Sequence, residues 1–464
     1  MTKTTQHSNS SALITLISVF FFWGFVAAGN DILIPVFKAK FQMEQWQSML
    51  ISFIFYIGYT VGSVIYLYIS TLLKKDVLQT LGYKKGIALG LLVSAFGALL
   101  FLPAALLVSY PITLIALFIV ALGFSLQQTA ANPLAVFLGK PEDGNKRLSL
   151  AGGVNNIGTT IAPFILSYAI FGSSGSEVVA ANIDIGAVKV PYLVLCAAFV
   201  LAAILFYTAR IPEPEVDTKV DISSAKSALS FPQLKWGMLA IFLYVGVEVS
   251  TGANLGEFMK AELGYSENKY APFVGLFWAS LMIGRWSSAP DAFSISTAFR
   301  NALRVLLPFA AFGIFILALY ISNTPIQYFL YYSPLILILI ASNFLSKGNA
   351  ANQLLIYSLL GAISIIIGML LPNPNQSVFA FMAVGLFCST LWPCVFTLAV
   401  DKLGNAATQG SSYLVMMIMG GGIVSMIQAG LADYLLGIRY SYLVGVVCFA
   451  YLAWYAYKAK KWTA

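Results

Sequence analysis

The residues LITLISVFFFWGFVAAGNDILIPVF, at positions 13–37, form one apolar run that contains a single charged side chain, Asp31. A helix that crosses the hydrocarbon core of a bilayer needs about 20 residues of this kind. The run meets that length and is too long for the core of a signal peptide. We therefore expect it to remain in the protein as the first transmembrane helix.

Most of the chain has the same character. Of its 464 residues, 59% are hydrophobic and 9% are charged, whereas soluble domains carry about 25% charged residues. This composition excludes a soluble globular protein and predicts an all-α membrane protein with about 14 transmembrane helices of about 20 residues each. We expect the spans at 13–37, 46–73, 86–107, 111–138, 147–172, 190–209, 236–259, 268–290, 300–321, 326–346, 351–371, 376–401, 409–432 and 440–458.

A polar stretch at 210–235 divides the predicted spans into two groups. It combines several prolines with charges of both signs, which is typical of a linker. We therefore expect an N-terminal six-helix bundle at 1–209, a cytoplasmic linker at 210–235 and a C-terminal bundle at 236–464. Secondary transporters built from two such repeats place their substrate near the midplane of the bilayer.

Membrane orientation explains the net charge of +8. Of the 26 Lys and Arg residues, only those at positions 38, 40, 189, 260, 269 and 439 fall on the outer side if the N-terminus is inside. The others then follow the positive-inside rule, so we expect both termini to be cytoplasmic. Because these charges are scattered through short loops, we expect no nucleic-acid partner.

The sequence lacks the residues of several common catalytic sites. Its one histidine, His7, lies in the polar N-terminal tail, which removes histidine-based metal sites and catalysis from the bundle. The segment 139–146 lacks the Lys-Ser/Thr ending of a phosphate loop. We therefore expect neither an enzyme nor a bound cofactor. The four cysteines form no CxxC pair and are expected to be packing residues: Cys196, Cys388, Cys394 and Cys448.

Two acidic residues, Asp31 and Glu248, lie well inside predicted spans. A carboxylate at membrane depth costs a few kcal/mol and usually faces a polar cavity or partner, so both are candidate functional residues. Pro35 leaves the carbonyl of Asp31 without its helical hydrogen-bond donor. Asp31 therefore offers a carboxylate and a backbone oxygen together, which can accept a proton, bind sodium or mark a kink.

Four uncharged amides give two predicted helices a polar face. Gln128 and Asn132 are one turn apart, and Asn155 and Asn156 lie on the next predicted helix. Amides donate and accept hydrogen bonds, which suits the hydroxyls of a sugar better than an ion or a fatty acid. The alternative is that they bond to neighbouring helices, as polar residues in membrane bundles also do.

Trp278 and Trp392 lie within predicted helices and can stack on the apolar face of a sugar. Their alternative role is packing or a place in the aromatic belt. We expect Arg285, at the inner end of its helix, to anchor that helix or to pair at a gate rather than to contact substrate.

Several of these residues lie in segments that resemble the fucose permease family of the major facilitator superfamily, and in particular its glucose/galactose transporter branch. The segments span both halves of the chain: Asn-Asp-Ile-Leu-Ile-Pro (30–35), Gln-Thr-Ala-Ala-Asn-Pro (128–133), Tyr-Val-Gly-Val-Glu (244–248), Gly-Ser-Ser-Tyr-Leu-Val-Met (410–416) and Gly-Gly-Gly-Ile-Val (420–424).

The resemblance implies the major facilitator fold, with two six-helix bundles and alternating-access symport of a monosaccharide. It places cation coupling at Asp31 with Asn30, and it adds Glu248 as a site residue. Fucose permease has Glu at the position of Gln128, whereas the glucose/galactose branch has Gln there and includes sodium-coupled members. Because the family has twelve helices, the runs at 300–321 and 326–346 are interpreted as a two-helix hairpin inserted at about 291–349.

These observations predict a monomeric hexose symporter of a bacterial inner membrane, surrounded by lipid, for a sugar such as glucose or galactose. Sodium at Asp31 is the favoured coupling ion and the proton is the alternative. The predicted sugar-binding residues are Gln128, Asn132, Asn155, Asn156, Glu248, Trp278 and Trp392. Two other functions stay open, a proton-coupled symporter of a fucose-like sugar and a membrane sugar sensor that does not transport.

Overall fold

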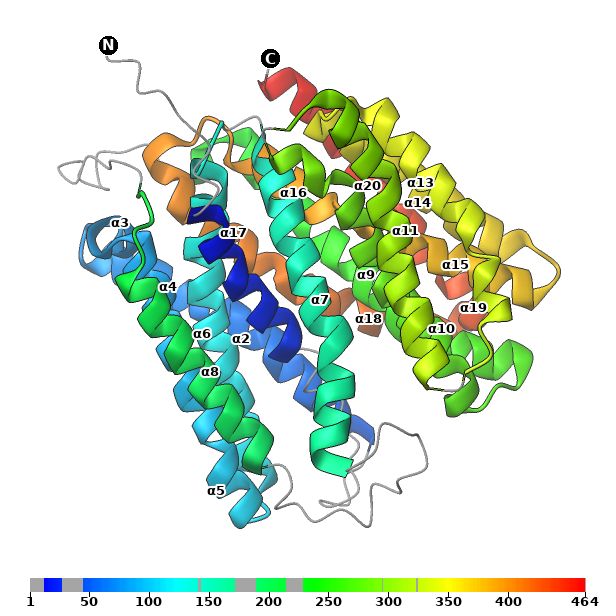
Figure 1. Ribbon diagram of the computed structural model, residues 1–464, viewed down its shortest axis with the longest axis horizontal. Helices are drawn as coiled ribbons and strands as arrows, with labels where there is room; N and C mark the ends of the chain where they lie inside the picture. Colours follow the sequence, from blue (N-terminus) through cyan, green and yellow to red (C-terminus); the bar gives the residue numbers. More distant parts are fainter. Residues whose placement is uncertain are drawn as a thin grey trace.

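Long helices make up nearly all of the described chain in the computed structural model (Figure 1). The structure describes residues 12–26, 45–140, 143–171, 189–213, 228–293, 295–322 and 324–463. The first half of these residues holds a helix at Ala12–Val26 and then α2 (Gln45–Leu72), α3 (Val77–Leu81), α4 (Tyr83–Leu99), α5 (Phe101–Leu106), α6 (Tyr110–Phe137), α7 (Gly144–Phe171) and α8 (Lys189–Thr208).

The second half of the chain continues from the described end of the linker. Its helices are α9 (Pro232–Leu263), α10 (Glu267–Ser288), α11 (Thr297–Ile321), α12 (Gln327–Leu330), α13 (Ser333–Ser346), α14 (Ala350–Leu370), α15 (Pro374–Cys388), α16 (Leu391–Val400), α17 (Ala407–Met416), α18 (Gly420–Leu431), α19 (Gly437–Ser441) and α20 (Leu443–Thr463).

The helices of each half pack mainly against one another. In the first half, α4 packs between α6 and α8, and α2 packs on α6. In the second half, α14 packs against α15 and α20, and α9 packs against α18 and α20. Figure 1 shows the blue-to-green first half beside the green-to-red second half, with α17 reaching across to α2 and α6.

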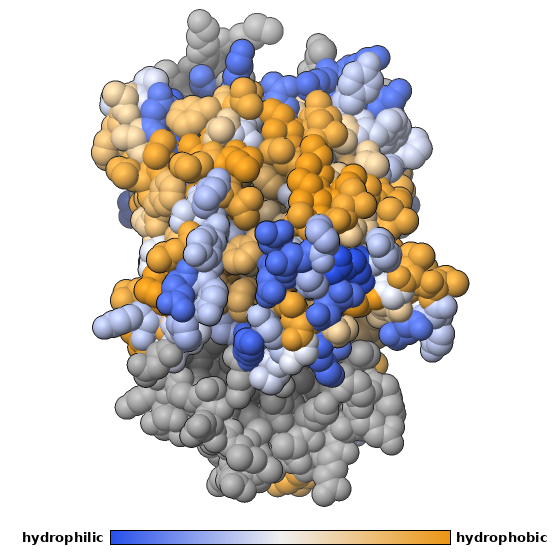
Figure 2. All heavy atoms as spheres, turned by 90° about the vertical axis from the view of Figure 1, so that its right-hand side faces the viewer, coloured by the Kyte–Doolittle hydropathy of each residue, from blue (hydrophilic) through white to orange (hydrophobic). Residues whose placement is uncertain are grey.

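The outer surface of the bundle suits a bilayer. Ten described helices are long and apolar enough to cross one, at Phe53–Leu72, Tyr83–Leu106, Tyr110–Phe137, Lys189–Thr208, Pro232–Leu263, Thr297–Ile321, Gln327–Ser346, Ala350–Leu370, Pro374–Val400 and Gly404–Ser441, beside the shorter apolar helix at Ala12–Val26. Figure 2 shows an apolar band across one side of the molecule, with hydrophilic residues above and below it. An apolar band between two polar rims is the surface that a hydrocarbon core solvates.

Local sequence signals fix several helix ends. Pro232 and Pro374 are the first residues of α9 and α15, a position where the missing N–H costs nothing. The side chain of Asn349 accepts a hydrogen bond from the backbone of Asn352 at the start of α14. Gly264 ends α9 in the left-handed conformation, at a φ of 64°.

Two predicted spans are interrupted rather than continuous. The run at 376–401 divides into α15 and α16 just before Pro393, which has no N–H to continue the helical ladder. The run at 409–432 divides into α17 and α18 through a short 3₁₀ turn at Met417–Met419. Pro133, by contrast, lies inside an unbroken α6.

The four cysteines are unpaired in the structure. Cys388, Cys394 and Cys448 are buried and Cys196 is half-buried. These positions agree with the packing role that the sequence predicts for them.

The two halves contact each other toward one end of the bundle. We call this end the linker face, because α8 ends there and α9 begins there. Tyr83 and Thr408 share a hydrogen bond of 2.6 Å between their hydroxyl oxygens, and the Ser412 hydroxyl donates to the Ser63 carbonyl at 3.3 Å. Nearer the middle of α2, the Thr60 hydroxyl donates to the Met416 carbonyl at 3.1 Å. These contacts close the bundle on this side.

The close approach of the N-terminal helix to α7 makes a testable prediction at Gly24. A Cβ atom there would lie 1.9 Å from the backbone oxygen of Asn155, so Gly24→Ala forces the two helices apart. Overpacking of this kind costs about 1–3 kcal/mol. We expect a lower unfolding temperature for the purified variant in detergent, measured by scanning fluorimetry.

The matched control is Gly313→Ala on α11, where a Cβ atom would meet nothing within 4 Å. Since alanine is the better helix former, this change is expected to leave the unfolding temperature unchanged or raise it slightly. Equal unfolding temperatures for the two variants would contradict the close approach at Gly24.

Candidate functional site

Glu248 lies in the middle of α9 and has a hydroxyl partner on its own helix. Tyr244, one turn earlier, donates a hydrogen bond from its hydroxyl to Glu248 Oε2 at 2.5 Å. The Tyr244 side chain is buried, and its ring lies 6.4 Å from that of Trp392 on α16. The Glu248 side chain therefore has a hydrogen-bond donor at membrane depth, where a polar group needs a partner.

Arg285 on α10 makes three hydrogen bonds, two of which join it to the other half. Its Nε donates to the Ser389 carbonyl at 2.7 Å, within the second half. Its Nη1 donates to Asn156 Oδ1 at 2.6 Å and to the Gly152 carbonyl at 3.2 Å, both on α7. Hydrogen bonds from a charged donor are stronger than those between neutral groups, so this guanidinium is a bridge between α7 and α10.

The charge of Arg285 also reaches the acidic residue of the second half. The guanidinium lies near enough to Glu248 and Tyr244 for its charge to act on both. Arg285 thus stands between a predicted sugar ligand of the first half, Asn156, and the acidic residue of the second half. The sequence predicts an anchoring or gating role for Arg285. Its hydrogen bonds across the two halves fit a gate, and its contact with Asn156 also brings it to the candidate site.

Two further amides have partners within the first half. Gln128 donates through Nε2 to the Tyr59 hydroxyl at 3.2 Å. Asn155 donates through Nδ2 to the Phe20 carbonyl at 2.8 Å. The Asn155 bond joins α7 to the N-terminal helix, which is the helix-to-helix role that the sequence leaves open for these amides. Its Oδ1 atom is not used by that bond.

Asn132 on α6 differs from the other amides. Its side chain is 1% exposed, and neither its Oδ1 nor its Nδ2 has a hydrogen-bond partner in the described part of the chain. The hydroxyl of Thr129, three residues earlier, is also buried without a partner there. Buried polar groups nearly always find a partner. This stretch of α6 therefore has unused hydrogen-bonding capacity for water or a polyhydroxyl ligand.

The remaining predicted site residues stand apart. Trp278 is 38% exposed, and its described contacts are with Phe277 and Gly252, not with another candidate residue. Asn30 and Asp31 lie outside the described residues, so the coupling site, including sodium at Asp31, stays a prediction. Among the described residues no group of three or more His, Cys, Asp or Glu side chains could hold a metal ion.

The structure thus adds residues that the sequence analysis did not select. Tyr244 had a visible signal, because it stands four residues before Glu248 and so shares its helix face. Tyr59, the partner of Gln128, had none, since its pairing depends on how α2 packs on α6. The candidate residues together offer amides, hydroxyls, aromatic rings, one carboxylate and one guanidinium, which are groups that can bind a polyhydroxyl ligand.

Comparison with known proteins identifies the family. The sequence model of the Major Facilitator Superfamily matches residues 12–356. The chain belongs to the Major Facilitator Superfamily. It is 34% identical over 459 residues to the glucose/galactose transporter of Brucella abortus, covering 98% of this chain and 95% of that one. It is 28% identical over 459 residues to the L-fucose-proton symporter of Escherichia coli, covering 94% and 90% of the two chains.

A solved structure of the superfamily has the same fold. The crystal structure of the major facilitator transporter FucP in the outward conformation superposes with a TM-score of 0.74 at 24% identity, covering 98% of this chain and 99% of that one. The family resemblance is therefore confirmed, and the chain is an all-helical, multi-pass membrane protein of the Major Facilitator Superfamily. The prediction that it is not an enzyme is confirmed as well, because its relatives are transporters.

The hydrogen bonds of Arg285 to α7 are expected to keep the two halves together at the linker face. Arg285→Gln removes the charge that binds α7, and hydrogen bonds to a charged group contribute about 1.5–3 kcal/mol. We expect the linker face to open more often, so that a cysteine placed at buried Ser412 reacts about tenfold faster with a maleimide. The measurement is the labelling rate of Ser412→Cys in a background without the four native cysteines.

The control is Arg300→Gln, because the partners of Arg300 among the described residues, the Phe293 and Ile295 carbonyls and Asp291, all lie in the second half. This variant should label at the unaltered rate. If Arg285→Gln also labels at that rate, the guanidinium does not hold the halves together.

Proposed function

We propose that this member of the superfamily is a cation-coupled monosaccharide symporter that works by alternating access, with a hexose such as glucose or galactose as substrate. The Brucella relative, matched along nearly its whole length, is named a glucose/galactose transporter. A relative from Helicobacter pylori, 28% identical over 462 residues, is named a putative glucose/galactose transporter. Two relatives of similar name support this substrate class over fucose.

The observation that carries the proposal is the meeting of intramembrane polar groups between the two halves. Asn156 of the first half is hydrogen-bonded to Arg285 of the second, and the charge of the same guanidinium acts on Glu248. A sugar placed among these groups contacts both halves at once. Its binding then differs between conformations, as alternating access requires.

The first-half amides are the sugar-binding groups in this proposal. Asn132 and Thr129 have buried polar atoms that find no partner in the described part of the chain, and Gln128 bonds to the Tyr59 hydroxyl. Asn155 and Asn156 add amide atoms on the neighbouring α7. Trp392, beside Tyr244, is placed to stack on the apolar face of the ring, whereas Trp278 remains the least supported member of the predicted set.

Coupling is assigned to Asp31 with Asn30, assisted by Glu248. We favour sodium as the coupling ion, from the resemblance to the glucose/galactose branch. The proton is the alternative, and the Escherichia coli relative named L-fucose-proton symporter supports it. In both cases the protein must bind the cation and the sugar cooperatively, so that each ligand raises the affinity of the protein for the other.

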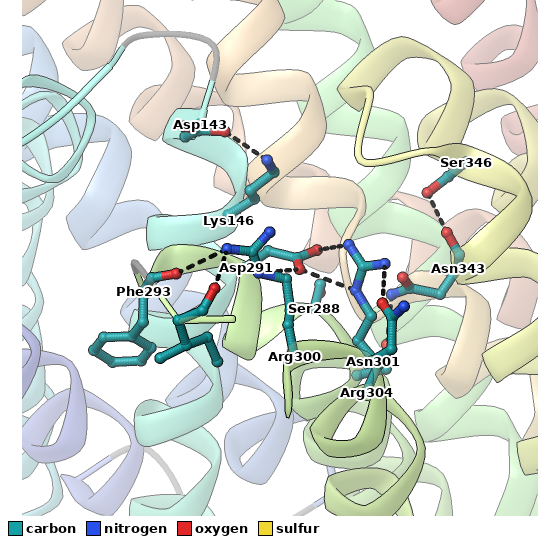
Figure 3. A network of polar contacts seen from close by, with 12 residues as sticks. Asp143, Lys146, Ser288, Asp291, Phe293, Arg300, Asn301, Arg304, Asn343 and Ser346 are labelled. Atoms are coloured by element: carbon teal, nitrogen blue, oxygen red, sulfur yellow. Dashed lines mark hydrogen bonds and ion pairs between the residues drawn. The ribbon is translucent and has the colours of Figure 1, made fainter. Parts of the chain in front are cut away.

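We further propose fourteen transmembrane helices, with α11 to α13 as an inserted hairpin between α10 and α14. The hairpin is fixed to α10 at the linker face, where Arg304 of α11 makes bonds of 2.7 and 2.9 Å to the Asp291 carboxylate (Figure 3). Asn343 of α13 donates to the Ser287 hydroxyl at 2.9 Å. Asp291 is only 4% exposed, so this pair is shielded from solvent.

The positions of the charged residues support an orientation. With the linker face in the cytoplasm, both termini and the linker at 210–235 are cytoplasmic, as the positive-inside rule favours. We place the protein as a monomer in the inner membrane of a bacterial cell, with the bundles 1–209 and 236–464 rocking about the midplane site.

Uptake into proteoliposomes tests the function. We expect labelled glucose or galactose to exchange in counterflow, and an inward sodium gradient to drive accumulation. A proton gradient that drives accumulation in place of sodium would reverse the choice of ion. Sugar binding without counterflow would instead support a sensor.

Variants test the assigned residues. Glu248→Gln removes the charge that Tyr244 hydrogen-bonds, and we expect it to weaken counterflow by about tenfold or more. The control is Glu257→Gln on the same helix, whose exposed side chain pairs with Lys260 at 3.9 Å. Asp31→Asn should keep counterflow but lose gradient-driven accumulation. Full accumulation by Asp31→Asn would remove Asp31 from the coupling site.

A further inference from the structure

A large cavity opens at the linker face between the two halves. Its volume is about 1190 Å³. The first half contributes the end of α6 and the start of α7, and the second half contributes the α13–α14 turn, the segment from α16 to α17 and the end of α20. None of the predicted sugar-binding residues lines this cavity, although Pro133, the neighbour of Asn132 in the chain, does.

The walls of this cavity carry an excess of positive charge. Five lysines line it against two aspartates, Asp143 and Asp401: Lys140, Lys146, Lys347, Lys402 and Lys460. One aspartate is engaged, because Lys146 Nζ lies 2.5 Å from Asp143 Oδ1 (Figure 3). Like charges that gather around one cavity repel, and an anion placed among them relieves that repulsion.

Backbone groups add to this field. The first turns of three helices border the cavity, namely α7, α14 and α17. A helix N-terminus presents unpaired N–H groups and a partial positive charge, which favour a phosphate. Two features oppose this positive field. The C-terminal ends of α6 and α16, which carry a partial negative charge, also border the cavity. In addition, Lys402 Nζ donates a hydrogen bond to the Trp462 carbonyl at 3.4 Å. The lysines and the three helix starts together still leave a net positive site.

The cavity wall also contains uncharged hydrogen-bonding groups. Thr397 lies in the wall, and its Oγ1 is buried without a partner among the described residues. The Asn349 side chain, which caps α14, lies on the same wall. Hydroxyl and amide groups next to an anion site suit a ligand that carries hydroxyls as well as a phosphate.

We propose that this cavity binds a phosphorylated monosaccharide, with its phosphate held by lysines of both halves and its hydroxyls by the uncharged wall. A phosphate monoester carries a charge of about −2 at neutral pH, which matches a site that several ammonium groups surround. The choice of a sugar phosphate rests on the proposed function, because an imported sugar that is phosphorylated in the cytoplasm appears at this face.

Such a ligand inhibits transport. Its binding groups come from both halves, Lys146 from the first and Lys347 and Lys402 from the second, so it binds most tightly when the linker face is closed. A ligand shifts an equilibrium toward the state it binds better. The bound anion therefore slows the opening of this face and reduces sugar import when its own concentration is high.

Binding to the purified full chain tests the site. We expect glucose 6-phosphate to bind in calorimetry, inorganic phosphate to bind more weakly and glucose to leave this site empty. The test variant is Lys347→Asn with Lys402→Asn, since both lysines have positive φ, which asparagine tolerates. Its affinity for glucose 6-phosphate should fall about tenfold or more.

The matched control is Lys74→Asn with Lys75→Asn. It removes the same charge at the same end of the bundle, Lys74 also has positive φ, and neither residue lines the cavity. This variant should bind like the unaltered protein. Three results would each overturn a sugar-phosphate site. The first is an equal loss of glucose 6-phosphate affinity in both double variants, and the second is an affinity for inorganic phosphate equal to that for glucose 6-phosphate. The third is displacement of glucose 6-phosphate by nanodiscs of phosphatidylglycerol but not by nanodiscs of phosphatidylcholine.

A transport measurement separates this proposal from the proposed function. Glucose 6-phosphate is supplied on both sides of the vesicle, so that it reaches the linker face in either orientation. We expect several-fold slower glucose counterflow for the unaltered protein and the Lys74/Lys75 variant, and no effect for the Lys347/Lys402 variant. If glucose 6-phosphate leaves the counterflow rate unchanged, the proposed inhibition is wrong. If no counterflow occurs even when glucose 6-phosphate is absent, the proposed sugar transport is wrong instead.

Discussion

The structure depends on one constraint, that a polar group inside an apolar bundle needs a partner within the protein. Helices meet it for the backbone, which is why they make up nearly all of the described chain. Side chains meet it by pairing between helices, as Trp23 Nε1 does with Gln127 Oε1 at 2.6 Å. Where the groups come from different halves, as with Arg285 and Asn156, the same requirement joins the two halves of the protein.

This constraint explains why much of the fold could be predicted from the sequence. Span length and hydropathy are properties of a segment by itself, so the predicted runs at 111–138 and 351–371 agree closely with α6 and α14. The interruption between α15 and α16 could not be predicted in the same way. Pro393 and Pro133 both lie within predicted spans, yet of these two only Pro393 lies next to a break. The difference arises from packing around each proline, which a single segment does not encode.

The sequence predicts which helices and residue types form the candidate site, but not which residues hydrogen-bond to one another. Polar residues in apolar runs pointed to α6, α7 and α9, since such residues are costly unless they have a role. The sequence did not show that Gln127 is engaged by Trp23 while its neighbour Gln128 reaches Tyr59. Nor did it show that a basic residue at a helix end, Arg285, would contact Asn156. These pairings depend on the rotation and spacing of helices that are distant in sequence.

At the linker face, hydrogen bonds attract the two halves to each other and lysine charges repel them. Bonds such as Tyr83 to Thr408 and Arg285 to Asn156 favour closure, while lysines of both halves gather around one cavity when the face is closed. The two effects oppose each other across the same boundary. A transporter that alternates between conformations needs the free energies of those conformations to differ by only a few kcal/mol. Positive charge gathered from both halves opposes these hydrogen bonds and so acts to keep that difference small. An anion bound in the cavity, as proposed, would alter this balance.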